Sequence, residues 1–137
     1  MVYNAKAKDC KERIYLAVSN DGEHWERYGN RAIIDMVTED PNGVITGDAQ
    51  ILLLDDIYVM HFFRYRRGES AYNTFACSRD LENWTIWEGE PLIKSEEVWE
   101  NVHAHKPWFV RHNGKNYHYY CACNRNRERF IAVAVSE

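Results

Sequence analysis

Two short segments of the chain place acidic and imidazole side chains at the starts of apolar, strand-like runs. Asp48 follows Gly47 before one run, and His103 and His105 alternate along the segment that opens another. Alternate residues of a strand share a face, so the two imidazoles suit a polar channel or a metal pair. The simpler interpretations are a turn-capping carboxylate for Asp48 and ordinary hydrogen-bonded histidines.

A Ser-x-Asp-x-x-x-Trp hairpin is repeated along the chain. Full copies begin at Ser19 and Ser78, and residues 136–137 match the start of a third, which gives a period of 58 to 59 residues. Short strands repeated at such a period predict stacked or radially arranged β-sheets. Serine and aspartate cap turn amides, and tryptophan buries its ring between neighbouring sheets, so we interpret Asp21, Asp80 and their serines as fold markers.

The strand order predicts an all-β protein, an incomplete β-propeller of four-stranded antiparallel blades. Residues 47–94 are expected to form one full blade, with strands at 47–54, 57–63, 72–77 and 84–87. Residues 1–46 are expected to supply the outer two strands of a preceding blade, and residues 95–137 most of the next. This amounts to about two to two and a half blades, whereas closed propellers have roughly four to eight.

Composition excludes some classes of partner. The 17 basic and 21 acidic residues are interspersed, with a net charge of −4, so no nucleic acid is expected. No apolar stretch is long enough for a bilayer, and residues 1–8 lack the apolar core of a secretory signal. We therefore expect a soluble protein without a membrane partner, cytoplasmic if this N-terminus is native. The basic runs at 64–67 and 125–129 are expected to be solvated turns.

The cysteines give little support to a metal site. Cys77, Cys121 and Cys123 lie in apolar, strand-like runs, and no second pair matches the spacing of Cys121 and Cys123. Buried free thiols are expected, which mildly favours a reducing compartment.

The hairpins and the strand order resemble those of the five-bladed β-propeller glycoside hydrolases, which include arabinanase/xylosidase-like, invertase-like and neoagarobiose hydrolase-like enzymes. The resemblance covers nearly the whole sequence but only part of the family domain. Residues 48–51 (Asp-Ala-Gln-Ile) resemble the family's Asp-Pro-x-Ile motif, and residues 105–107 (His-Lys-Pro) resemble its Glu-Gly-Pro motif. The resemblance implies a carbohydrate in the central channel and glycoside hydrolysis. The alternative is a non-catalytic carbohydrate-binding or self-assembling fragment.

The resemblance also implies roles for single residues. In these enzymes two carboxyl-type groups flank the glycosidic bond, one as acid and one as base or nucleophile. Asp48 would orient the substrate or tune a pKa, and it aligns with Lys106 in the next blade. His105, in place of the usual glutamate, would act as general acid. The family's base has no counterpart here, no cofactor or metal is implied although a channel-bound cation fits, and further blades or copies of the chain would complete the ring.

Four residues are candidates for contact with the sugar: His103, Trp99, Trp108 and Glu100. A tryptophan ring can stack on a sugar, although burial between blades is its commoner fate in this fold. Glu100 would supply the missing carboxyl group, whereas the acidic run at 96–100 also fits a solvated loop.

Two other features receive a structural interpretation. Residues 40–43 (Asp-Pro-Asn-Gly) spell an invertase-like nucleophile motif, but they lie farther from Tyr58 than the family spacing, which Asp48 fits better. The same four residues form an ideal turn, so we expect an inter-blade loop. His61 and His118 fall within second strands of their blades and are expected in the core or at an edge.

Overall fold

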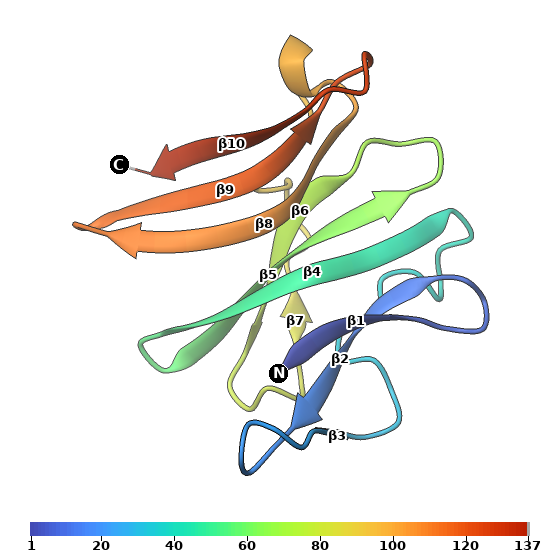
Figure 1. The fold of residues 1–137 in the computed structure, drawn as a ribbon, viewed down its shortest axis with the longest axis vertical. Helices are drawn as coiled ribbons and strands as arrows, with labels where there is room; N and C mark the ends of the chain where they lie inside the picture. The colour runs from blue at the N-terminus through green and yellow to red at the C-terminus, as the bar shows by residue number, and fades with distance from the viewer. Residues whose placement is uncertain (137) are drawn as a thin grey trace.

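The computed structural model describes residues 1–136, and these residues form an all-β fold (Figure 1). The strands are β1 (Val2–Lys6), β2 (Glu12–Val18), β3 (Glu26–Arg27), β4 (Gly43–Leu54), β5 (Ile57–Arg66), β6 (Tyr72–Ser78), β7 (Thr85–Ile86), β8 (His103–His112), β9 (Lys115–Cys123) and β10 (Arg129–Ser136). A short 3-10 helix, η1, spans Val98–Glu100. Of the third hairpin copy, Glu137 lies outside the described residues.

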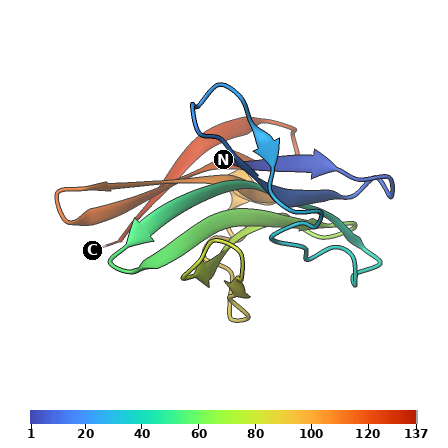
Figure 2. The ribbon, with the colours of Figure 1, turned by 90° about the horizontal axis from the view of Figure 1, so that it is seen from below.

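The strands form three antiparallel units that follow one another in chain order. The first is β1 to β3, the second is β4 to β7, and the third is β8 to β10. Figure 1 shows the third unit at one end and the first at the other, and in Figure 2 β7 lies well away from β4 at the far edge of its unit. The four-stranded unit confirms the expected strand order between the two hairpins.

Two differences from the expected strands concern the first half of the chain. β1 was not anticipated, so the first unit has three strands rather than two. β1 is a strand because it pairs with β2 along its whole length, from Val2 opposite Leu16 to Lys6 opposite Glu12. β4 begins at Gly43, four residues before the expected start, because Gly43 already pairs with Arg66.

Neighbouring units meet through equivalent contacts one repeat apart. A parallel pair joins Glu12 to Ile45, and an isolated parallel bridge joins Ala71 to His103. Each pair links the start of the strand that precedes a hairpin, β2 or β6, to the first strand of the next unit. The 58- to 59-residue period of the sequence is thus a period of the fold.

Both full hairpins have the structure expected of fold markers. In the first, Ser19 Oγ accepts from the Gly22 amide at 2.8 Å and Asp21 Oδ1 accepts from the His24 amide at 2.8 Å. In the second, the corresponding distances to the Leu81 and Asn83 amides are 3.0 and 2.7 Å. The side chains therefore cap amides that the tight turn leaves without backbone partners.

The core lies between the units. Ile14 of β2 and Ile34, which follows β3 and bridges to Ile14, pack with Met60, Phe62 and Ala76 of the second unit, and all five are buried. The ring of Trp84 packs against this cluster, as expected, but the ring of Trp25 is 44% exposed. Trp25 belongs to the first unit, and no described sheet covers the outer side of that unit.

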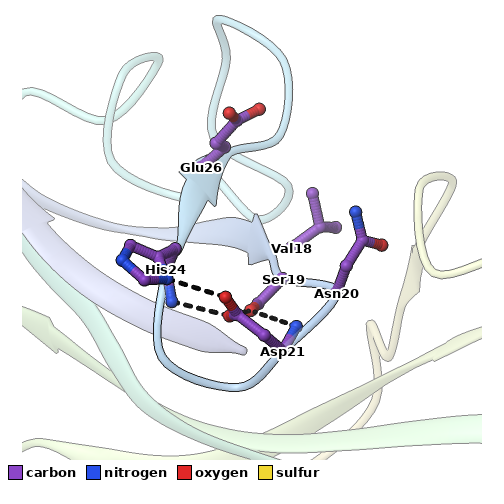
Figure 3. Close-up of a pocket in the computed structure, with 6 residues that line it drawn as sticks. All are labelled: Val18, Ser19, Asn20, Asp21, His24 and Glu26. Atoms are coloured by element: carbon purple, nitrogen blue, oxygen red, sulfur yellow. Dashed lines mark hydrogen bonds and ion pairs between the residues drawn. The ribbon is translucent and has the colours of Figure 1, made fainter.

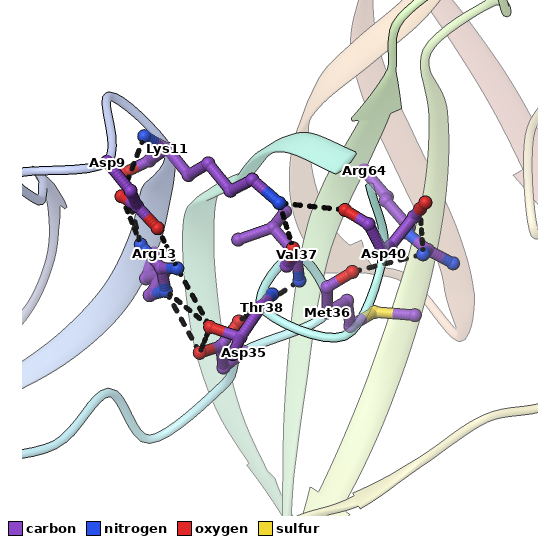
Figure 4. Close-up of polar contacts among 9 residues, drawn as sticks. All are labelled: Asp9, Lys11, Arg13, Asp35, Met36, Val37, Thr38, Asp40 and Arg64. Atoms are coloured by element: carbon purple, nitrogen blue, oxygen red, sulfur yellow. Dashed lines mark hydrogen bonds and ion pairs between the residues drawn. The ribbon is translucent and has the colours of Figure 1, made fainter. Parts of the chain in front are cut away.

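Ion pairs hold the loop between the first two units, as Figure 4 shows. Asp40 pairs with Arg64 and Arg66 at 2.7 Å each, and Lys11 Nζ donates to the Asp40 carbonyl at 2.8 Å. The Gly43 amide donates to the same carbonyl, which confirms that Asp40 opens a turn. The expectation that residues 64–67 form a solvated turn was wrong for Arg64 and Arg66, because both lie on β5 and neutralise this carboxylate.

One face of the third unit is apolar and uncovered. Its exposed side chains, together called the open face, are Trp108, Val110, Tyr119, Ile131, Val133 and Val135. They are contiguous because Trp108 pairs with Tyr119, and Tyr119 with Val133. A propeller blade presents such a surface to its next neighbour, so the open face is what an incomplete propeller would leave. In the described residues, no helix combines the length and the apolar character needed to cross a membrane.

Candidate functional site

A cavity of about 410 Å³ lies where the first two units meet the third. The starts of β2, β4, β8 and β10 and the end of β5 converge there, because alternate strands of each unit run in opposite directions. Its polar and charged lining includes Glu12, Asp48, His103, His105, Lys106 and Arg129. We call it the inter-blade cavity. It contains Asp48, His103 and His105, three of the six residues singled out from the sequence.

Asp48 and Lys106 occupy equivalent bulges in the two first strands. The pairing register shifts between Gly47 and Gln50 in β4 and between His105 and Trp108 in β8. At these bulges Asp48 has φ 52° and Lys106 has φ 59°, a left-handed conformation that costs a non-glycine residue about 1–2 kcal/mol. Lys106 Nζ lies 2.6 Å from Asp48 Oδ2. The bulges therefore turn two side chains from different blades toward each other.

A second contact fixes the Asp48 carboxylate. Asn4 Nδ2 donates to Asp48 Oδ1 at 2.8 Å, and Asn4 Oδ1 accepts from the Asp48 amide at 2.9 Å. Asn4 can approach because residue 47 is glycine, since a Cβ there would lie 2.6 Å from Asn4 Nδ2. With one oxygen bound to an amide and the other to an ammonium, the Asp48 carboxylate is held in one orientation.

His103 and His105 have opposite hydrogen-bonding roles. His103 Nδ1 accepts from the Ala71 amide at 3.0 Å, so the neutral ring carries its proton on Nε2 and offers a donor there. His105 Nδ1 lies 2.9 Å from the Cys121 carbonyl and must donate to it, which leaves Nε2 as an acceptor. A ring with its proton on Nε2 cannot bind a cation through that atom, so His103 does not fit a metal pair, one of the two interpretations of the alternating histidines.

Burial lowers the pKa of both histidines. For His105 the hydrogen bond to Cys121 opposes this effect, and the nearby cations Lys106 and Arg129 add to it. For His103 Arg129 adds to it as well. Both rings are therefore mostly neutral at pH 7. Phe63 and Tyr65 meet the two imidazoles edge to face, with centroid distances of 5.5 and 5.4 Å, and give the cavity an aromatic wall.

The structure does not bring the other three candidates to this cavity. Trp108 is 58% exposed on the open face, and Trp99 lines a separate surface groove next to Phe130. Glu100 is only 4% exposed, so the solvated-loop interpretation was wrong for it. Burial and the Glu100 carboxylate raise the pKa of Tyr120, which places this carboxylate against β9 rather than on the inter-blade cavity.

A serine, an aspartate and a histidine also meet in the first hairpin (Figure 3), but not as a nucleophile and its base. Ser19 Oγ donates to Asp21 Oδ1 at 2.9 Å, and His24 Nδ1 lies 2.7 Å from Asp21 Oδ2. The serine hydroxyl is thus bound to the carboxylate and not to the imidazole, whereas an activated serine needs the reverse. In the second hairpin Asn83 replaces the histidine and binds Asp80 in the same way, as expected for a capping motif.

Two charged residues of the cavity were missed. Glu12 starts β2 without any recognisable motif, and its only signal is its position one repeat before Ala71, where the blades meet. Arg129 lies in a basic run that we assigned to a solvated turn, yet it opens β10 and lines the cavity. The buried histidines were expected correctly: His61 and His118 are 6% and 5% exposed. All four cysteines are free, but only Cys123 is buried, whereas Cys77 and Cys121 are half-buried and Cys10 is exposed.

Solved structures similar to this chain include propeller-type glycoside hydrolases. A structure of BT0996 in an RGII complex is 37% identical with a TM-score of 0.86, and a second structure, named glycoside hydrolase, is 36% identical with the same TM-score. In both cases the similar region covers 98% of this chain and 39% of the other chain. A thermostable family-43 glycoside hydrolase is 21% identical, with a TM-score of 0.72 over all of this chain and 46% of its own. No protein-family model and no curated protein matches the sequence.

These similarities confirm the expected class. The chain has the fold of an incomplete β-propeller of the glycoside hydrolase type. It spans about two fifths of the two structures with the higher identity, at 39% of each. The similarity supports a function that involves carbohydrate.

Proposed function

We propose that this chain is part of a propeller glycoside hydrolase and that its carbohydrate binds at the inter-blade cavity. The observation that carries the proposal is the ion pair between Asp48 and Lys106, beside His105. Its two residues come from the first strands of successive blades and are 58 residues apart. Two strained bulges and the contact with Asn4 maintain this geometry, and such strain persists where surrounding structure holds it, often at functional sites.

In this proposal Asp48 orients the sugar and His105 transfers a proton. Because Asp48 is already bound by Asn4 and Lys106, it acts as a fixed anionic acceptor for a sugar hydroxyl. The free Nε2 of His105 faces no competing partner among the hydrogen bonds of the described residues. It can take up a proton below its pKa and deliver it to the leaving oxygen, the role of a general acid. Glu12 supplies a second carboxyl group to the same cavity.

The test is hydrolysis of a broad panel of glycosides by the protein and by Asp48→Asn and His105→Ala. Both variants are expected to abolish turnover while keeping the far-ultraviolet circular dichroism of the unchanged protein. His24→Ala, which alters an exposed histidine in the first hairpin, is the matched control and should retain activity. Full activity in both cavity variants would overturn the proposal.

A second candidate is a non-catalytic carbohydrate-binding module that associates with itself. The open face favours it, since Ile131 is 85% and Trp108 58% exposed. The occupant in this case is a second copy of the chain, because the opposite end of the molecule presents a stacked aromatic pair, Tyr3 and Tyr15, 5.8 Å apart. This candidate predicts sugar binding without turnover, dimers or larger species in light scattering, and weaker association of Ile131→Lys. A monomer at all concentrations would exclude it.

A further inference from the structure

The charges around the inter-blade cavity are unevenly placed. Lys106 is neutralised by Asp48 at 2.6 Å. The two remaining charged residues, Arg129 on β10 and Glu12 on β2, form no ion pair with any residue of the described part of the protein. They belong to the third and first units, so the two charges come from different blades.

The guanidinium of Arg129 lines the cavity from the third unit, which also carries both histidines. Arg129 lies close enough to lower the pKa of both His103 and His105, in addition to the larger effect of burial. Because Asp48 pairs with Lys106, Arg129 is the cation acting on His105 that has no ion-pair partner among the described residues. An anionic ligand group is therefore favoured beside these two rings.

The neutral groups beside Arg129 suit a sugar. His103 presents an Nε2 donor and His105 an Nε2 acceptor, so adjacent rings can donate to and accept from hydroxyl groups in complementary fashion. Arginine presents a planar set of donors that matches the two oxygens of a carboxylate. Hydroxyls and a carboxylate occur together in acidic sugars, of which the uronic acids are the simplest ring-closed examples.

We propose that the inter-blade cavity takes an acidic sugar, with the carboxylate of a uronic acid bound by the Arg129 guanidinium and its hydroxyls by His103 and His105. This inference rests on the proposed function, because it names the substrate class for the same cavity. It assigns Arg129 to specificity rather than to catalysis.

The experiment compares sugars that differ only in charge. D-galacturonic acid, D-glucuronic acid and the uncharged methyl ester of each are titrated separately into the protein. Binding is followed by NMR. The unchanged protein should bind the acids about three- to tenfold more tightly than the esters, as expected for one charge-assisted pair at a partly exposed site. Arg129→Gln should lose that preference and keep ester binding. Arg127→Gln, in the preceding turn, removes the same charge away from the cavity and should leave the preference intact.

The possible results distinguish the acidic-sugar assignment from the proposed function on which it rests. Equal binding of acids and esters, or an acid preference that survives Arg129→Gln, would overturn the acidic-sugar assignment and leave carbohydrate binding standing. Failure of the protein to bind any of the four sugars would count against both. Loss of the preference in Arg127→Gln as well as Arg129→Gln would show a general charge effect and would also overturn the role of Arg129.

Discussion

The contact between the second and third units predicts an acid-sensitive fold. Phe109 stacks on His61 with a centroid distance of 3.7 Å and lies 4.2 Å from the ring of His118. Burial lowers the pKa of each histidine from 6.5 to about 4, and His61 adds to the effect on His118. The native state therefore holds both rings neutral, while the unfolded state takes up protons near the unperturbed pKa.

The sign and size follow from proton linkage. Both histidines have a lower pKa in the native state than in the unfolded state. Their contribution to the free energy of unfolding is therefore fully present above pH 6.5 and is lost as pH falls from 6.5 to about 4. A shift from 6.5 to about 4 corresponds to about 3 kcal/mol for one histidine, at roughly 1.4 kcal/mol for each pH unit. The two rings lie 6.5 Å apart, so their contributions are coupled and will not simply add.

The assay is urea unfolding at pH 7.5 and pH 4.5, followed by tryptophan fluorescence. The free energy of unfolding of the unchanged protein should be lower at pH 4.5 than at pH 7.5. In His61→Phe, which keeps an aromatic ring on Phe109, this decrease should be about 2–3 kcal/mol smaller. The aspartates with lowered pKa values lose their stabilising contribution mainly as pH falls from 3.8 to about 2, below this window. Identical pH dependence in the unchanged protein and His61→Phe would refute the reasoning, because the buried ring would then not be the group that takes up the proton.

Three further predictions concern the inter-blade cavity. Gly47→Ala should reduce sugar binding and destabilise the protein by about 1–3 kcal/mol in urea unfolding, because the new Cβ displaces Asn4 from Asp48; unchanged binding would contradict this. Lys106→Met should change stability by less than about 1 kcal/mol, since the ion pair is half exposed, but weaken sugar binding measured by calorimetry. If His105 is the acid, its lowered pKa means that kcat/KM should fall about tenfold per pH unit above that value; activity rising through pH 7 would exclude the role.

The repeated hairpin was the sequence feature that predicted most of the fold. Local capping residues repeat because each turn needs the same amides satisfied, so Ser19 and Ser78 could be matched without a structure. The same register aligned Asp48 with Lys106, and the structure places both in equivalent left-handed bulges. The bulges themselves were not predicted, because a non-glycine residue at positive φ has no reliable sequence signal.

Burial of charged side chains was the part that sequence patterns missed. The sequence pattern predicted a solvated basic turn for Arg64 and Arg66 and a solvated acidic loop for Glu100. Arg64 and Arg66 are half-buried and Glu100 is buried, because a partner or a packed surface receives each of them: Asp40 in the first case and β9 in the second. The short strand β1 was missed for a related reason, since its strand state depends on pairing with β2.

The sequence by itself determined the strand order, the positions of the blade hairpins and the equivalence of residues one repeat apart, because turns and alternating strands depend on near neighbours in the chain. Only the tertiary structure decided which charges share the inter-blade cavity. Asp48 meets Lys106 across 58 residues, and Arg129 lines the same cavity as His103 and His105 from the third strand of their unit. Such contacts depend on how blades stack on one another, and no local pattern encodes that stacking.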